Sequence, residues 1–107
     1  MKEIIITISD LPEEDKLALS KLVSENCKIE ETKGADGVTN EIIKILVENP
    51  IVCGIVANIA TEIVKAIAID SWHRIKISVK MPDGSKFINL GKDKFLLLIR
   101  KYFENQA

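Results

Sequence analysis

The residue types that could perform acid–base or nucleophilic chemistry are few and isolated in this sequence. His73 is the only histidine, and it stands in Trp72-His73-Arg74 with no catalytic motif around it. A histidine at a helix C-terminus interacts favourably with the helix dipole, which accounts for this residue without a catalytic role. No serine occupies a nucleophile-elbow sequence, and a single histidine offers little material for a hydrolytic triad. We therefore predict no catalytic residues and a protein that is not an enzyme.

Metal and cofactor sites are also disfavoured. Cys27 and Cys53 do not form a paired-cysteine motif, and one histidine cannot complete a zinc site with them. The acidic run Glu13-Glu14-Asp15 lacks the alternating oxygen ligands and the glycine of a calcium loop. The Gly34–Gly37 loop precedes an apolar segment but lacks the spacing of a phosphate-binding loop. We expect no metal and no cofactor, and leave open whether this loop binds an anion.

One segment does suggest binding. Residues 74–81 alternate strictly between apolar and polar types, as a half-buried strand does. The turn sequence Pro82-Asp83-Gly84-Ser85 predicts a hairpin with Asp83-Gly84 as its two-residue loop. In that register Phe87 lies opposite Lys80, and the opposite face is predicted to join the core through Ile75, Ile77, Val79, Ile88 and Leu90.

The outward hairpin face is the alternative binding surface. Sheets that bind single-stranded nucleic acid combine basic side chains with aromatic residues on which bases stack. The residues of this type on the predicted face are Arg74, Lys76, Lys80 and Phe87. Charged residues are also what any solvated hairpin needs, so the main hypothesis lies elsewhere in the chain.

The leading candidate for an interaction surface is a long apolar helix predicted over residues 51–70. Its isoleucines and valines share one face, and its polar stripe is narrow. A third face carries mostly small residues, namely Cys53, Ala57, Ala60, Val64 and Ala68. A helix that is apolar around most of its circumference must be covered on two sides. The bulky face suits a sheet, and the small face suits a second helix, either from the same chain or from another copy of it.

The polar stripe of this helix affects two further questions, namely whether a partner helix covers the stripe and whether the helix enters a membrane. Asn58, Glu62 and Lys65 either form a solvated edge or, beneath a partner helix, fix the register of that contact. Residues 51–69 approach membrane-spanning length, but these three polar residues near the middle make burial in a bilayer costly. Membrane perturbation by a released 51–69 helix is therefore a second alternative, and a membrane partner is not expected.

These candidates must be positioned by a single α+β domain over residues 1–107. We predict the order β-α-β-α-α-β-β-α and an open mixed sheet of about four strands with helices packed on it. The segment 3–9 should be a central strand covered on both faces, and 27–30 a charged edge strand. Residues 39–48 are predicted as a helix that precedes the long apolar one.

Charge and cysteine usage indicate the environment. The net charge is −1, but residues 1–53 hold 6 basic and 11 acidic residues, whereas residues 54–107 hold 9 and 5. This asymmetry is typical of a dipolar surface, with head-to-tail association or a basic binding face as alternatives. Two isolated cysteines favour a reducing compartment, and residues 1–9 lack a signal-peptide core. We expect a cytoplasmic protein.

Three local features together resemble a known family. They are Gly34-Ala35-Asp36-Gly37 before an apolar segment, Trp72 ending the second apolar helix, and the Met81-Pro82-Asp83-Gly84 hairpin ahead of a leucine-rich helix. They resemble the effector-associated constant component family, small α+β proteins encoded in bacterial conflict and defence loci. The resemblance runs over nearly the whole chain and brings no catalytic residues. It implies an accessory component of an effector or defence system that acts through protein–protein contacts. The apolar circumference of the 51–70 helix adds self-association as one form of such contact.

Overall fold

The computed structural model describes residues 3–22, 27–34, 37–47 and 50–106, and the side chains of 50–57 and 103–106 lie outside that description. These described residues form a five-stranded sheet and three α-helices, with one short 3₁₀ helix, η1. Their bounds are β1 Glu3–Ser9, α1 Glu13–Ser20, β2 Cys27–Lys33, β3 Thr39–Leu46, α2 Pro50–Ala66, η1 Ile69–His73, β4 Lys76–Lys80, β5 Lys86–Leu90 and α3 Lys92–Gln106.

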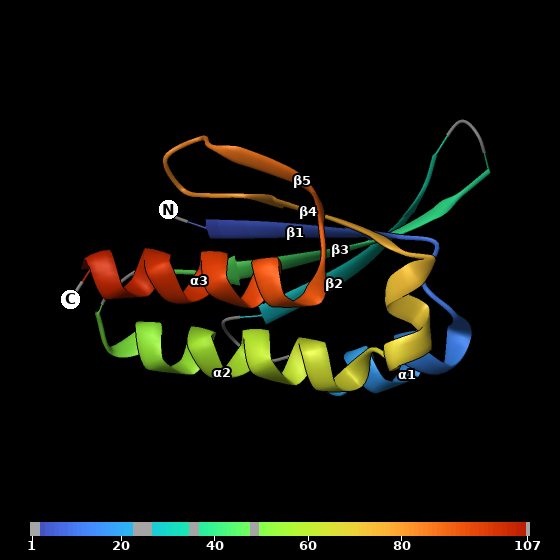
Figure 1. Cartoon of the computed structure of the whole chain (residues 1–107), viewed down its shortest axis with the longest axis horizontal. Coiled ribbons are helices and arrows are strands. Elements are labelled where there is room, and N and C mark those ends of the chain that lie inside the picture. Colours follow the sequence, from blue (N-terminus) through green and yellow to red (C-terminus); the bar gives the residue numbers. More distant parts are fainter. Residues whose placement is uncertain (1–2, 23–26, 35–36, 48–49, 107) are drawn as a thin grey trace.

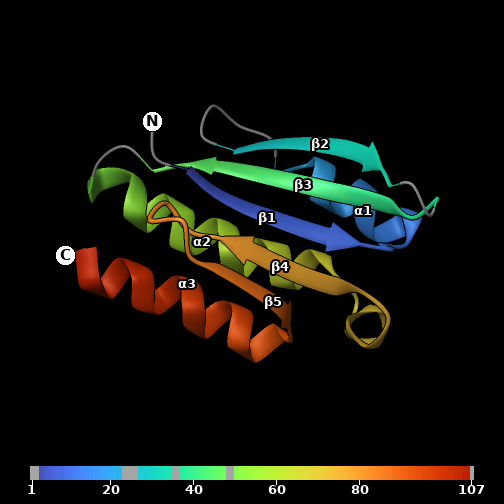
Figure 2. The ribbon, with the colours of Figure 1, turned by 90° about the horizontal axis from the view of Figure 1, so that it is seen from above.

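The sheet is antiparallel throughout, in the order β2-β3-β1-β4-β5 (Figure 2). The first strand lies in the centre, because its backbone pairs with β3 on one side and with β4 on the other. The predicted central position of residues 3–9 is therefore confirmed, as is the edge position of the strand that begins at Cys27. The mixed sheet of about four strands is corrected to an antiparallel sheet of five.

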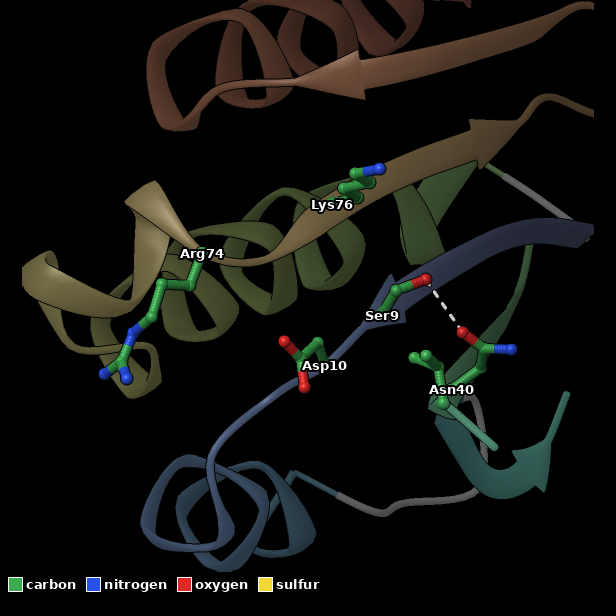
Figure 3. Close-up of a pocket in the computed structure, with 6 residues that line it drawn as sticks. Ser9, Asp10, Asn40, Arg74 and Lys76 are labelled. Atoms are coloured by element: carbon green, nitrogen blue, oxygen red, sulfur yellow. Dashed lines mark hydrogen bonds between the residues drawn. The ribbon is translucent and has the colours of Figure 1, made fainter. Parts of the chain in front are cut away.

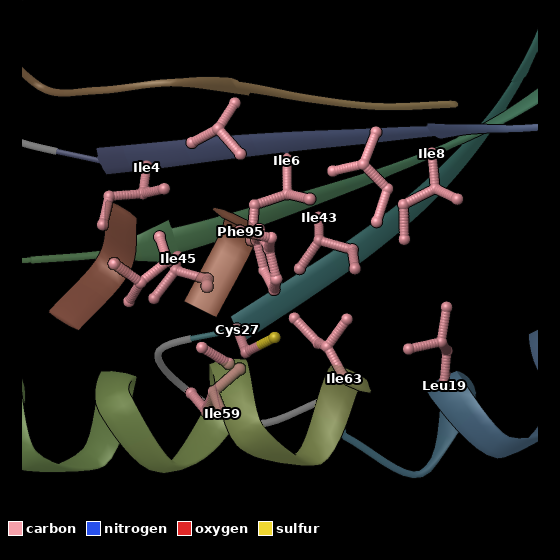
Figure 4. Close-up of a cluster of buried hydrophobic side chains, with 14 of the residues drawn as sticks. Ile4, Ile6, Ile8, Leu19, Cys27, Ile43, Ile45, Ile59, Ile63 and Phe95 are labelled. Carbon is pink, nitrogen blue, oxygen red and sulfur yellow. The ribbon is translucent and has the colours of Figure 1, made fainter. Parts of the chain in front are cut away.

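All three helices lie on one face of the sheet, and α2 and α3 run along the strands (Figure 1). The covered face supplies the core. Inward residues of β1, β3 and β4 alternate with outward ones and are almost fully buried against α2 and α3 (Figure 4). They pack with Leu19, Ile59, Ile63, Phe95 and Ile99 in one cluster. Within the described chain no element covers the opposite face, so the expectation that β1 is covered on both faces was wrong (Figure 2).

The helix predicted over residues 39–48 is the strand β3. The sequence allowed both readings, because Ile42, Ile43, Ile45 and Leu46 also fall within one helical face. Strand geometry wins because β-branched isoleucines suit a pleated surface, and because β3 fills the position between β1 and β2. Glu41 lies on the inward side of β3, where a strand pattern leads one to expect an apolar residue. This charged residue interrupts the alternation of apolar and polar residues that would otherwise indicate a strand.

The hairpin between β4 and β5 has a three-residue loop instead of the predicted two-residue one. The Met81 N–H donates to the Ser85 carbonyl at 2.8 Å, and Gly84 adopts a positive φ of 93°. A loop of this kind with glycine in the left-handed region is a common alternative to the two-residue turn. The Asp83 carboxylate accepts a hydrogen bond from the Ser85 N–H at 2.8 Å, which lowers the pKa of Asp83.

This loop shifts the register near the turn. Val79 lies opposite Phe87, and an irregularity at Asn89, which has a positive φ of 54°, restores the predicted pairing of Ile77 with Leu90. Phe87 consequently shares the side of Val79 but stays 39% exposed on the edge strand, and Ile88 points outward with 65% of its surface exposed. The predicted core residues Ile75, Ile77 and Val79 are buried and Leu90 is partly buried, but the prediction for Ile88 was wrong.

The long apolar helix is shorter than predicted. It begins at Pro50, as a proline in the first turn suggests, but ends at Ala66 instead of Asp70. The remaining residues form η1, which leads into β4. Ile59, Ile63 and Ile67 are buried beneath the sheet, while the polar stripe Asn58, Thr61, Glu62 and Lys65 is exposed. Glu62 and Lys65 form an ion pair of 3.7 Å on this exposed stripe.

Two neighbouring isoleucines test the one-sided covering of β3. Ile43 is fully buried against the helices, whereas Ile42 is partly exposed on the opposite face. We expect Ile43→Ala to lower the free energy of unfolding by about 3 kcal/mol, through lost burial and the cavity left behind. The matched Ile42→Ala substitution should cost about 1 kcal/mol or less, since little packing is lost. Urea denaturation measures both, and equal costs would contradict this arrangement of the strand.

Candidate functional site

The side of the sheet that the helices leave open is the largest candidate surface, and we call it the uncovered face. Cross-strand pairing brings outward residues of all five strands into rows. One row places Lys28 beside Lys44, then Ile5, Lys80 and Lys86. The next row runs through Glu30, Ile42, Thr7 and Ser78. Antiparallel sheets commonly present one polar face to water, but this one keeps several apolar residues along its centre.

Ile5 occupies the middle of the lysine row. It lies directly between Lys44 on β3 and Lys80 on β4, and its side chain is only partly exposed. Lysine side chains can lay their methylene groups over apolar neighbours while the ammonium stays in water. The two flanking lysines therefore explain how an isoleucine is accommodated in the centre of an uncovered sheet. The same contact leaves two ammonium groups at the sides of an apolar strip.

The uncovered face is more basic than the chain as a whole. Among the residues that the structure describes, its outward positions hold two glutamates, Glu3 and Glu30, and five lysines, namely Lys28, Lys44, Lys76, Lys80 and Lys86. The whole chain carries a net charge of −1. Within the described residues the face has one ion pair, between Lys44 and Glu30 at 3.4 Å. The other four ammonium groups are available to an anionic partner.

A shallow pocket of about 400 Å³ adjoins this face at the end of β1. Its lining comes from three adjacent strands and their ends, namely Ser9, Asp10, Val38, Asn40, Arg74 and Lys76. The Ser9 hydroxyl donates to the amide oxygen of Asn40 at 2.7 Å (Figure 3). Asp10 has a positive φ of 62°. It lies between Arg74 on one side and the hydrogen-bonded pair of Ser9 and Asn40 on the other. The pocket thus combines one carboxylate with two cationic side chains.

The pocket geometry does not activate Ser9 as a nucleophile. A serine nucleophile needs a base that accepts its proton, and here the hydroxyl donates to an amide oxygen, which is not basic. His73 lies on η1 and is exposed, and it is not among the residues that line the pocket. Asp10, Arg74 and Lys76 instead suit polar contacts with a partner at the edge of the uncovered face.

Lys16, a partly buried residue of α1 on the covered side of the sheet, lies close to three carboxylates. The Lys16 Nζ lies 3.1 Å from Glu13 Oε1, 3.6 Å from Glu31 Oε2 and 3.7 Å from Glu41 Oε1. Glu31 and Glu41 are directly paired across β2 and β3, and Glu41 is only 5% exposed. The buried Glu41 Oε1 and the buried Asp15 Oδ2 accept no hydrogen bond. Burial, followed by the neighbouring Glu31, raises the pKa of Glu41, and the attraction to Lys16 opposes this only partly.

The sequence-predicted basic face is only partly assembled. Arg74, Lys76 and Lys80 are exposed, and Lys76 and Lys80 share the uncovered face. Phe87 does not join them, because the three-residue loop turns it to the core side. The contributions of Lys28 and Lys44 were missed, because β3 was predicted to be helical. The β-branched run from Ile42 to Ile45 was the signal that could have revealed them.

The predicted interaction surface on α2 is partly described. Ala60 is 2% exposed and Val64 is partly buried, within a single chain whose α2 packs beside α3 and α1. Ala68 lies beyond the end of the helix and is exposed. Cys53 and Ala57 lie outside the described side chains. A helix of the same chain therefore approaches α2, which is one of the two partners that the sequence left open.

The remaining candidates behave as ordinary structural residues. Cys27 is a free, buried cysteine, and burial raises the pKa of its thiol, which keeps it protonated. The part of the chain that the structure describes holds no group of three potential metal ligands. In the glycine loop, positions 35–36 lie outside the described residues. The N–H groups of Gly34 and Gly37 donate to the carbonyls of Val38 and Gly34, so neither is turned toward an anion.

Comparisons with known proteins add no relative. The sequence matches no protein-family model and no curated protein, and the fold matches no solved structure. None of the described helices is long and apolar enough to cross a membrane.

The raised pKa of Glu41 predicts how stability depends on pH. The folded state binds this proton more tightly than the unfolded state, so the contribution of Glu41 to stability falls as pH rises past its ordinary value of 4.5. We expect Glu41→Gln to increase the free energy of unfolding at pH 7 by on the order of 1 kcal/mol, because a buried charge is removed. The gain should shrink toward pH 4.

Chemical denaturation across this pH range measures the effect. The matched control is Glu62→Gln on the exposed stripe of α2, which should change stability little at any pH. A Glu41→Gln variant that is less stable than the parent at pH 7 would show that the attraction to Lys16 outweighs burial.

Proposed function

We propose that this protein is a non-catalytic binding component that acts through protein–protein contacts on its uncovered face. The observation that carries the proposal is the row of lysines around Ile5 on a sheet face that no helix of the described chain covers. Contiguous apolar surface rimmed by polar groups is typical of interaction sites. The shallow pocket at the end of β1 adjoins this surface and adds Arg74 and Asp10 to it.

The cellular setting is part of the same proposal. The resemblance to the effector-associated constant component family supports an accessory role in a bacterial effector or defence system in the cytoplasm. The buried, protonated thiol of Cys27 is compatible with a reducing compartment. The serine that lines the shallow pocket, Ser9, donates its hydroxyl proton to an amide oxygen rather than to a base, which favours binding over nucleophilic catalysis there.

Nucleic-acid binding is the second candidate, because the same lysines could contact phosphates. The geometry favours it less. Among the described residues no aromatic side chain lies on the uncovered face, and Phe87 is turned away from it. Single-strand binders rely on such side chains for base stacking. Self-association through α2 and membrane perturbation by its release are less favoured still, because Ile59, Ala60 and Ile63 are already buried.

Site-specific photo-cross-linking in the native host tests the binding surface. A photoreactive amino acid at Ile42, on the uncovered face, should form a discrete protein adduct. The same group at Lys101, exposed on α3, is the matched control and should form none. The adduct from Ile42 should also disappear in a Lys80→Glu background, because this change reverses a charge on the face without altering the labelled position. Equal adducts from both positions, or an adduct that survives Lys80→Glu, would contradict the proposal.

A further inference from the structure

We propose that the uncovered face binds an acidic, amphipathic α-helix of a partner protein, laid along the strands above β1. This inference rests on the proposed function and deepens it, since it names the kind of partner. It is carried by three properties of the face: the order of charged and apolar residues across the strands, the size of the face, and the shortage of compensating acidic groups.

The order of side chains across the face indicates where a partner must carry apolar residues and where it must carry acidic ones. The apolar residues near the centre of the face are Ile5 on β1 and Ile42 on β3, which lie in successive cross-strand rows and are partly exposed. Lysines stand on both sides of Ile5, with Lys28 and Lys44 toward β2 and with Lys80 and Lys86 toward β5. A complementary segment needs apolar residues in the middle and carboxylates on both flanks. An amphipathic helix has this arrangement, because residues three and four apart share a face.

The dimensions of the face suit a single helix. Five strands about 4.8 Å apart give a face about 24 Å wide, which is about 17 Å long at the five-residue strands β4 and β5 and about 24 Å long at the seven-residue β1. A helix of about 16 residues has the longer of these lengths and, with its side chains, a diameter of about 10–12 Å. On the covered face α2 and α3 already run along the strands (Figure 1). A partner helix in the same orientation would give the sheet a third layer.

Charge also argues against a second copy of this chain as the occupant. Two identical faces would bring five lysines against five lysines, with only Glu3 and Glu30 on each side to compensate. Like charges placed together across an interface oppose binding.

Binding of designed probes tests the charge and shape requirements together. The first probe is a fluorescent 16-residue amphipathic helix with leucines on one stripe and glutamates on both flanks. The second replaces every glutamate by lysine, and the third is a single-stranded oligouridylate of similar length. Fluorescence anisotropy with the full chain should show binding of the acidic helix at least roughly tenfold tighter than either other probe, and weaker binding as salt rises.

Matched variants connect this binding to the face. The double variant Lys44→Glu/Lys80→Glu should weaken binding of the acidic helix by roughly tenfold or more, and Lys44→Gln/Lys80→Gln should have an intermediate effect. The double variant Lys94→Glu/Lys101→Glu makes the same charge change on exposed positions of α3 and should leave the affinity within about twofold of the parent. Thermal unfolding followed by circular dichroism confirms that each variant is folded.

Three results would overturn the inference. They are no binding of the acidic helix up to about 500 µM, equal weakening by the α3 variant, and tighter binding of oligouridylate with the same dependence on Lys44 and Lys80. The last result would assign the face to nucleic acid. Each is distinguishable from failure of the proposed function, because photo-cross-linking at Ile42 detects a protein partner of any chemistry.

Discussion

The packing of every helix against the same side of the sheet is the constraint on which the rest of this structure depends. Alternate residues of β1, β3 and β4 are buried against α2 and α3, and this burial fixes the register of three strands at once. A shift of one residue would turn Ile4, Ile6 and Ile8 outward and bring polar residues into the core. The isoleucines therefore specify both the pairing and the side on which the helices dock.

One-sided packing creates the uncovered face and also its chemistry. A small domain has few helices available, and three of them suffice to bury one side of five strands. The other side must then stay compatible with water while still providing residues that favour strand structure. Ile5 between Lys44 and Lys80 satisfies both demands, since β-branched side chains suit strands and lysine stems shield apolar neighbours. The surface that results is both apolar and cationic, which is the combination that recognises an acidic amphipathic partner.

Sequence reasoning predicted the elements whose patterns were unambiguous and failed where two periods overlapped. The strand 3–9, the start of α2 at Pro50 and the strict alternation through Val79 were predicted correctly because each had a single interpretation. Residues 39–46 had two, and the buried Glu41 favoured the wrong one. The hairpin failed for a different reason, since Asp83-Gly84 fits both a two-residue loop and a three-residue loop that ends in glycine. Of the site, Lys76 and Lys80 were predicted on the correct face, whereas Lys28 and Lys44 reach it through the pairing of β3, whose strand signal was interpreted as a helix.

The central position of the first strand has a consequence for synthesis of the chain. Ile5 pairs with both Lys44 and Lys80, so the second partner of β1 lies 75 residues further along the sequence. A ribosome that adds about 5–20 residues per second needs several seconds to deliver β4 after β1 has been made. During that interval an isoleucine-rich strand has one free edge and no complete helical layer beneath it, since α3 is made last. The nascent chain is therefore most prone to aggregation before its last third emerges, and chaperone protection matters most in that window.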